Sequence, residues 1–268
     1  MGVFCVLCIG KSFSEDTNMK THNSPLLIHI PHASVYIPEE ERRFCIPDLN
    51  TELLNMTDLY TDELFGGPYD SIRFPVSRLV CDPERFRDDA SERMSDVGMG
   101  AVYTRASTGT VLRQIDETER ERILVRYYDP HHRAFADGVS EKLRRFGRCL
   151  IIDAHSFSPV PLPHEPDQRT DRPDFCIGTD PFHTPPVLRK TAEAYLTGRG
   201  FSVAVNRPFS GAIVPMAFCG VDRRVQSVMI EVNRSLYIEP DGRRKPAFAS
   251  IRNTIQGLLA ALEQTLCQ

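Results

Sequence analysis

The segment CLIIDAHS, at residues 149–156, indicates the fold more strongly than any other part of the chain. Its first half, Cys149–Ile152, is entirely apolar, as expected of a strand buried inside a sheet. The second half changes abruptly to mostly polar residues. Similar short apolar segments recur along the chain and alternate with segments of helical character. This alternation predicts an α/β protein with three layers, α/β/α, around a mixed, mostly parallel central sheet.

The apolar pattern and the positions of glycine and proline set the expected bounds of each element. The predicted strands cover residues 26–30, 71–76, 78–81, 149–152, 175–178, 201–205 and 225–232. The predicted helices cover residues 51–65, two segments of 116–145 separated at Asp129-Pro130, 185–199 and 247–266. We expect residues 1–24 to form a flexible extension and residues 25–268 a single domain, because composition does not change after residue 24.

Composition excludes several classes of protein. Of the 268 residues, 41% are hydrophobic and 25% are charged, which is typical of a globular protein. The 32 basic residues against 36 acidic ones give a net charge of -4, so a nucleic-acid partner is not expected. The sequence also lacks an apolar run long enough to span a membrane. The eight cysteines are scattered, including the isolated pair Cys5 and Cys8, which predicts reduced thiols and a cytoplasmic location.

Titratable side chains follow three of the predicted strands. His32 comes just after the first strand, His155 ends the segment described above, and Glu231 lies near the end of the strand at 225–232. In open α/β sheets, sites form beyond the carboxyl ends of the strands. Asp58 and Asp62 are four residues apart, so on the predicted helix they share a face, where a nearby cation would relieve their repulsion.

These residue types suit a hydrolytic metal site. Two histidines and a carboxylate are a common ligand set for catalytic zinc, which keeps one position open for water. A further glutamate that does not bind the metal can act as the general base. Iron, cobalt or manganese could occupy the same site. Asp153 could hydrogen bond to a ligand if the backbone turns after it.

Eight motifs occur in the order seen in N-formylglutamate amidohydrolases, which the chain resembles from about Pro25 to Ala261. The motifs are PHAS at 31–34, DLYTDEL at 58–64, DPERF at 82–86, YDPHH at 128–132, DAHSF at 153–157, DFCIG at 174–178, NRPFSG at 206–211 and IEVNRSLY at 230–237. The resemblance implies a fold similar to that of the zinc carboxypeptidases. It also implies metal-dependent hydrolysis of an N-formyl amide, which yields formate and glutamate in histidine catabolism.

The resemblance also implies roles for individual residues. His32, Asp62 and His155 would be the ligands of one zinc ion, although Asp58 and Glu63 compete with Asp62 for the carboxylate position. Glu231 would be the general base.

Further residues would contact the substrate or the developing oxyanion. Arg85 and His132 are the candidate catalytic donors, and Asn206, Arg207 and Arg234 lie in segments that would approach the substrate. Arginine suits a carboxylate because its guanidinium binds both oxygens. The implied substrate is therefore a small acidic N-acyl amino acid such as N-formyl-L-glutamate.

The chain departs from the family pattern at Ser34, Glu84 and Phe157, where glycine, asparagine and methionine are usual. These departures leave the implied ligands intact. Two alternatives remain: a related zinc amidase or peptidase acting on another N-acyl amino acid or peptide, and a binding module without catalysis. A cysteine hydrolase using Cys81 or Cys219 is disfavoured, because the sequence pairs neither thiol with a base.

Overall fold

The structure is a computed structural model that describes residues 22–266. Most of the predicted N-terminal extension, with Cys5 and Cys8, lies outside the described residues, so the division into extension and domain stays a prediction. Six strands form one sheet in the order β2-β1-β3-β6-β4-β5. Their bounds are β1 Leu26–Ile30, β2 Asp70–Arg73, β3 Cys149–Phe157, β4 Phe175–Gly178, β5 Val203–Val205 and β6 Val225–Asn233.

Every pair of neighbouring strands is parallel except β4 with β6. This confirms the predicted α/β class with a mixed, mostly parallel sheet. The two central strands, β3 and β6, have nine residues each, and all nine of β3 are buried. Both therefore extend beyond their shorter neighbours and carry polar side chains past the apolar core.

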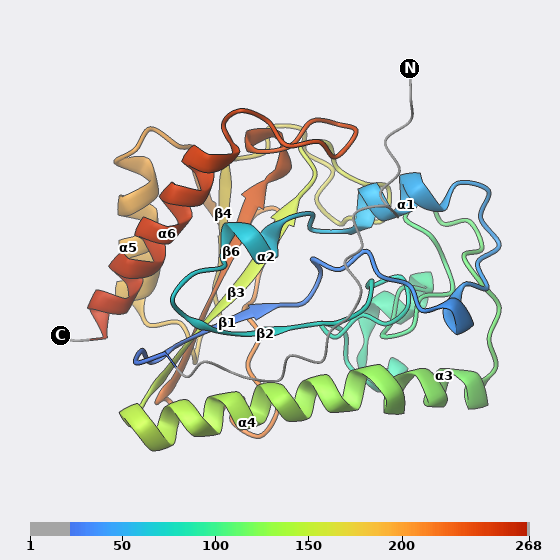
Figure 1. Cartoon of the computed structure of the whole chain (residues 1–268), viewed down its shortest axis with the longest axis horizontal. Helices are drawn as coiled ribbons and strands as arrows, with labels where there is room; N and C mark the ends of the chain where they lie inside the picture. The colour runs from blue at the N-terminus through green and yellow to red at the C-terminus, as the bar shows by residue number, and fades with distance from the viewer. Residues whose placement is uncertain (1–21, 267–268) are drawn as a thin grey trace.

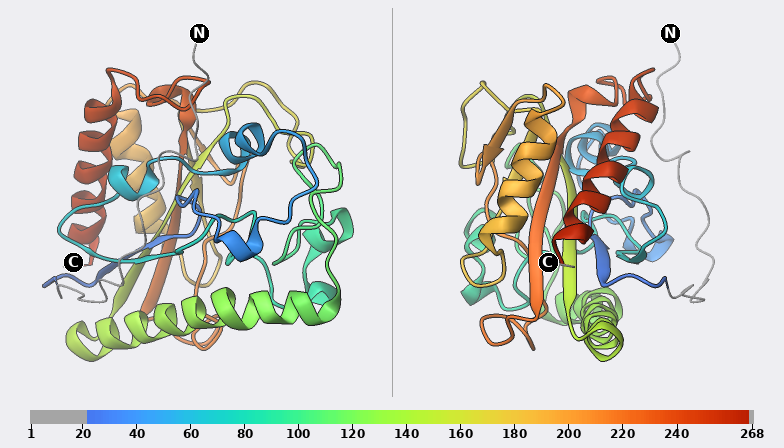
Figure 2. Two further views of the ribbon diagram at one scale, coloured as in Figure 1. Left: turned by 45° about the vertical axis from the view of Figure 1, so that its right-hand side comes forward. Right: turned by 90° about the vertical axis from the view of Figure 1, so that its left-hand side faces the viewer.

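Helices flank the sheet (Figures 1 and 2). Their bounds are α1 Leu49–Met56, α2 Thr61–Leu64, α3 Glu117–Ile123, α4 Asp129–Phe146, α5 Pro186–Thr197 and α6 Phe248–Thr265. Helix α4 packs against β1, β2 and β3, and α5 packs against α6 and β4. The core is divided in the same way, with a smaller cluster that includes Leu27, Phe135 and Ile151 beneath α4 and a larger cluster elsewhere.

The predicted helix at 51–65 is broken in the middle. Helix α1 ends at Met56, α2 begins at Thr61, and Tyr60 between them has a left-handed φ of 64°. The backbone N–H of Asp58 donates to the carbonyl of His32 at 3.0 Å rather than to its own helix. The break therefore ties this segment to the end of β1 and turns Asp58 out of the helical pattern.

Two other expectations need correction. Residues 78–80 form a turn, in which Val80 donates to Ser77, and not the predicted strand. The predicted break at Asp129-Pro130 is also wrong, since α3 and α4 join into one rod through a π-helical segment, Leu124–Tyr128 (Figure 1). Pro130 is the second residue of α4 and directly follows the wider π-helical turn, and the rod continues through it.

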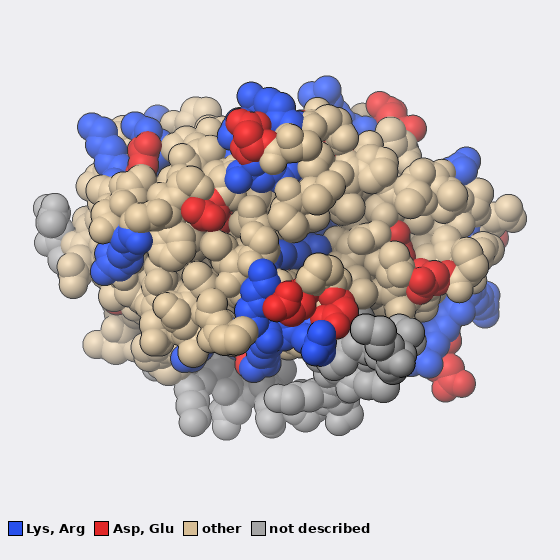
Figure 3. Space-filling model, turned by 90° about the horizontal axis from the view of Figure 1, so that it is seen from above, with Lys and Arg blue, Asp and Glu red and all other residues tan. Residues whose placement is uncertain are grey.

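Among residues 22–266, no helix has both the length and the apolarity to cross a membrane. Acidic and basic side chains are interspersed on the face shown in Figure 3. That pattern agrees with the small net charge.

Candidate metal centre

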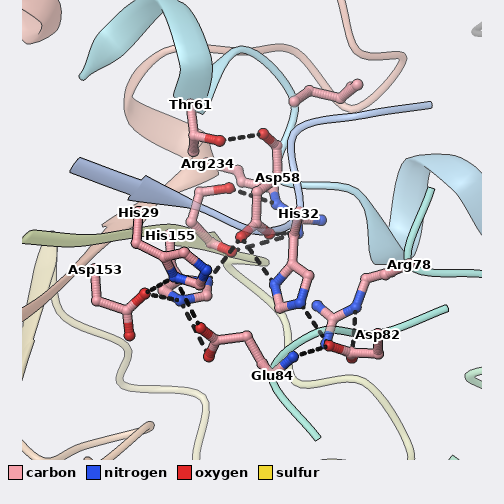
Figure 4. Close-up of polar contacts among 12 residues, drawn as sticks. His29, His32, Asp58, Thr61, Arg78, Asp82, Glu84, Asp153, His155 and Arg234 are labelled. Atoms are coloured by element: carbon pink, nitrogen blue, oxygen red, sulfur yellow. Dashed lines mark hydrogen bonds and ion pairs between the residues drawn. The ribbon is translucent and has the colours of Figure 1, made fainter. Parts of the chain in front are cut away.

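His32, Asp58 and His155 meet beyond the end of β1 (Figure 4). His32 lies two residues after β1, His155 lies in β3, and Asp58 comes from the break between α1 and α2. The Nδ1 atom of His155 is 3.2 Å from Oδ2 of Asp58, and Nδ1 of His32 is 3.7 Å from the same oxygen. All three side chains are buried. Three potential ligand atoms thus converge on one point.

The second nitrogen of each imidazole contacts a buried carboxylate. Nε2 of His32 lies 2.8 Å from Oδ1 of Asp82, and Nε2 of His155 lies 3.0 Å from Oδ1 of Asp153. Metal-binding histidines typically have such a partner, which fixes the tautomer and the ring orientation. Nδ1 of His32 is a buried atom without a hydrogen-bond partner. Both rings therefore direct Nδ1 towards Asp58, as a pair of metal ligands would.

The predicted turn after Asp153 is absent. Strand β3 continues through Phe157, and residues two apart on a strand share a face. Asp153 therefore reaches His155 along the strand itself.

Arg234 holds the carboxylate of Asp58. Its Nη2 donates to Oδ1 of Asp58 at 2.8 Å, and its Nη1 donates to the carbonyl of Asn55 at 2.7 Å. Burial alone would raise the pKa of Asp58. The interactions with His155 and His32 and the charge of Arg234 outweigh burial and lower that pKa. Arg234, predicted to bind substrate, lines the cavity but is already engaged in positioning Asp58.

Asp62, the carboxylate expected from the sequence, does not join the two histidines. Its Oδ2 lies 3.4 Å from Nη1 of Arg73, and both side chains are at least one-third exposed. Glu63 pairs with Arg244 in a similarly exposed position. The break before α2 explains the difference, because it separates Asp58 from the face that Asp62 occupies. The geometry therefore replaces Asp62 with Asp58.

Glu231 lies beside the metal candidates. It is paired with His155 in the register of β3 and β6, and its Oε2 is buried without a hydrogen-bond partner. Burial raises the pKa of Glu231 to about 8. A carboxylate with a raised pKa next to a candidate metal centre is suited to accept and return a proton.

A cavity of about 320 Å³ opens onto these residues. Arg85 lines the cavity, and its buried Nε has no hydrogen-bond partner; the nearest carboxylate oxygen, on Asp82, is 3.9 Å away. Arg78, in the same wall, is instead engaged by Asp82 at 2.7 Å. Arg85 is therefore the better placed of these two cations to bind an anion in the cavity.

Unsatisfied polar atoms are concentrated at this cavity. Among residues 22–266, nine buried side-chain atoms lack a hydrogen-bond partner, and five belong to residues that line it. The five atoms are His32 Nδ1, Glu84 Oε1, Arg85 Nε, His164 Nδ1 and Glu231 Oε2. Buried polar groups are normally paired, so this concentration indicates a site for a polar ligand.

Three predicted residues lie away from the cavity lining. Nε2 of His132 is 2.9 Å from the carbonyl of Pro83, and burial lowers the pKa of His132. Asn206 bonds to Thr179, and Arg207 forms an ion pair with Asp171 at 2.9 Å. Within the NRPFSG motif, residues 208–210 line the cavity, whereas Asn206 and Arg207 do not.

Other residues of the site escaped the sequence analysis. Asp82 and Glu84 belong to the DPERF motif, where only Arg85 was given a site role and Glu84 was noted as a departure from the family pattern. His29 stands out as the one polar residue in the apolar strand LLIHI, which was a usable signal. His164 sits in the proline-rich loop after β3, and no pattern in that loop identifies it.

The cysteines give no support to a thiol nucleophile. Cys81 is buried, and burial raises its pKa well above the usual range, which keeps the thiol protonated. Cys219 is exposed. Neither residue lines the cavity.

The fold and the site together define an α/β protein with a buried cluster of histidine and carboxylate ligands at the end of a mostly parallel sheet. Residues 24–238 match the family model for N-formylglutamate amidohydrolase. Because the match covers most of the chain, this protein belongs to the N-formylglutamate amidohydrolase family.

Similar proteins match nearly the full length of the chain. The chain is 26% identical to an N-formylglutamate deformylase from Pseudomonas aeruginosa, covering 92% of this chain and 96% of the relative. It is 24% identical to one from Pseudomonas putida, covering 88% and 92%. Among solved structures, N-formylglutamate amidohydrolase from Ralstonia eutropha superposes with a TM-score of 0.82 at 22% identity, covering 92% and 95%. A gene product from Agrobacterium tumefaciens gives a TM-score of 0.63 at 19% identity, covering 97% and 99%.

Proposed function

We propose that this protein is a metal-dependent amidohydrolase that cleaves the N-formyl or N-acyl amide of a small acidic amino acid, with N-formyl-L-glutamate as the first candidate. The observation that carries the proposal is the convergence of His32 Nδ1, His155 Nδ1 and Asp58 Oδ2 beside Glu231. The names of the two Pseudomonas relatives support the choice of substrate.

The residues present fit a divalent cation. His32 offers a buried Nδ1 without a hydrogen-bond partner. His155 offers its Nδ1, which contacts Asp58, and Asp58 offers an anionic oxygen. Mixed nitrogen and oxygen ligands of this kind suit zinc. A cation held there would lower the pKa of a water molecule and polarise the carbonyl of the amide.

The chain's own residues supply the remaining chemistry. Glu231 accepts a proton from the attacking water on its unpartnered Oε2 and returns it to the leaving amine. Arg85 binds a carboxylate of the substrate in the cavity. Arg234 keeps Asp58 in place through the hydrogen bonds described above.

The test is formate release from N-formyl-L-glutamate by zinc-loaded protein, with N-acetyl-L-glutamate assayed in parallel as acetate release. We expect formate from the wild type, and an increase in KM of about 10- to 100-fold in Arg85→Gln, because a charged hydrogen bond contributes about 1.5–3 kcal/mol. Acetate without formate would move the substrate to another N-acyl amino acid. Zinc binding with no hydrolysis of either substrate would favour the binding module.

A further inference from the structure

A second group of histidine and carboxylate side chains lies on the other side of the His155 ring (Figure 4). It consists of His29 from β1, Asp153 from β3 and Glu84 from the loop after β2. Nδ1 of His29 is 3.0 Å from Oδ1 of Asp153 and 3.3 Å from Oε1 of Glu84. We call these three residues the inner group, and His32, Asp58 and His155 the outer group.

The two groups differ in how their carboxylates are neutralised. In and beside the outer group, Asp58 pairs with Arg234 at 2.8 Å, and Asp82 pairs with Arg78 at 2.7 Å. The inner carboxylates have no lysine or arginine within ion-pair distance among the described residues. Their side-chain partners are the imidazoles of His29 and His155, and Asp153 also accepts a hydrogen bond from the backbone N–H of Ile213.

Buried carboxylates are costly unless a positive charge compensates them. Asp153 is 1% exposed and Glu84 is 15% exposed, so water does little to screen either charge. Two protonated imidazoles would supply the missing charge, and so would one divalent cation.

The distances within the inner group fit direct binding of a cation. Ligands at about 2.0–2.2 Å from a tetrahedral metal ion lie roughly 3.3–3.6 Å from one another. The inner distance of 3.3 Å lies at the edge of that range and the distance of 3.0 Å slightly below it. The other nitrogen of His29, Nε2, is 3.0 Å from Nε2 of His131, and the ring stacks on Phe135 at 4.4 Å. The His29 ring is thus held with Nδ1 facing the two carboxylates.

Glu84 gives a route into the inner group. It lines the cavity, whereas His29 is fully buried. A cation arriving through the cavity would therefore meet Glu84 first. Asp153 could bind the cation and still accept the hydrogen bond from His155, because a carboxylate has lone pairs for both.

We propose that His29, Glu84 and Asp153 form a second divalent-cation site, next to the outer group and separated from it by the ring of His155. This site goes beyond the proposed function, which needs only the outer group. A cation there would compensate the two inner carboxylates and hold Asp153, and through it the ring of His155.

The test counts bound ions. Full-length protein stripped with a chelator is titrated with Zn²⁺ by calorimetry, and bound zinc is measured after gel filtration. We expect two ions per wild-type chain and one in Glu84→Gln. The matched control is Glu165→Gln, another cavity glutamate whose charge is paired with Arg172 rather than with a histidine; it should keep two. Circular dichroism checks that each variant is folded.

The outcomes separate this site from the outer one. One ion in the wild type, retained in Glu84→Gln and lost in Asp58→Asn, would overturn the second site and leave the proposed function intact. Two ions in the wild type, with one lost in Glu84→Gln and none lost in Asp58→Asn, would support the inner site and contradict the outer one. If Glu84→Gln fails to fold, the number of zinc ions bound by the wild type is the test, and one ion per chain would overturn the second site.

Discussion

The outer and inner groups are built from the same residue types but differ in their surroundings. The outer group faces a cavity, keeps an unpartnered histidine nitrogen and has one carboxylate, which pairs with an arginine. The inner group reaches the cavity only through Glu84, and its carboxylates pair with imidazoles rather than with arginine. His155 belongs to the outer group, and its Nε2 contacts the inner one. Because the two groups share their ligand types, local charge and the unpartnered nitrogen of His32 are the grounds on which we propose the catalytic role for the outer group.

Removing the shared ring should have the largest effect. In His155→Ala we expect zinc binding to the outer group to be lost and kcat/KM to fall by more than about a thousandfold, because a catalytic metal supplies several kcal/mol of stabilisation. Zinc content and formate release measure the two effects. Full zinc content in the folded variant would show that His155 is not a ligand.

Replacing Glu231 should separate catalysis from metal binding. Glu231→Gln preserves the shape of the side chain, so zinc content should equal that of the wild type. We expect kcat to fall by about 10²- to 10⁴-fold through loss of the general base. A variant that retained wild-type kcat would exclude Glu231 from proton transfer.

The pH dependence follows from the raised pKa of Glu231, about 8 in the metal-free protein. A base works only when deprotonated, so kcat/KM should fall as the pH is lowered past the pKa of Glu231. A nearby cation lowers that pKa, so the fall should occur below pH 8. A raised pKa in the folded state also means that metal-free protein loses stability as pH rises from about 4.5 to about 8. Glu231→Gln should remove both effects, as measured by pH–rate profiles and thermal unfolding.

A change beside the outer group should weaken it selectively. Asp82 contacts Nε2 of His32 and accepts a hydrogen bond from the backbone N–H of Glu84, but it contacts no side chain of the inner group. In Asp82→Asn we expect zinc affinity at the outer group to fall about 10- to 100-fold, as for other carboxylates that support a ligand histidine. In a calorimetric titration with zinc, binding to the outer group should weaken while binding to the inner group stays unchanged. Equal weakening of both phases would contradict the separation of the groups.

The smallest effect is expected at Asp62. Its ion pair with Arg73 is partly exposed, and ion pairs that solvent reaches contribute about 1 kcal/mol or less. Asp62→Asn should therefore keep zinc content and kcat within about twofold, with a similarly small change in the free energy of unfolding. A loss of zinc in this variant would restore Asp62 as the ligand.

The sequence predicted the parts of the fold that depend on local pattern. The apolar run before His155 and the one that includes Glu231 gave both central strands and placed both residues at the site. The resemblance to the family ranked Asp62 above Asp58. The pattern at 51–65 predicts one helix and gives no sign of the break, where the backbone N–H of Asp58 bonds to the carbonyl of His32. Tertiary contacts of that kind leave no periodic signal.

The same reasoning explains why three of the predicted site residues lie away from the cavity lining. The motifs around His132 and Asn206 identify segments near the site, but side-chain direction depends on packing that the motifs do not encode. His132 faces Pro83, and Arg207 faces Asp171. His29 was passed over because a polar residue inside an apolar strand has no assigned partner until β1 is paired with β3.

The most direct test of the account is the rate of formate release from N-formyl-L-glutamate at saturating zinc in the wild type, Asp58→Asn and Asp62→Asn. The account predicts release by the wild type, a rate within about twofold in Asp62→Asn, where only an exposed ion pair is lost, and near-complete loss in Asp58→Asn. Wild-type activity in Asp58→Asn would contradict the assignment of the metal centre to His32, Asp58 and His155.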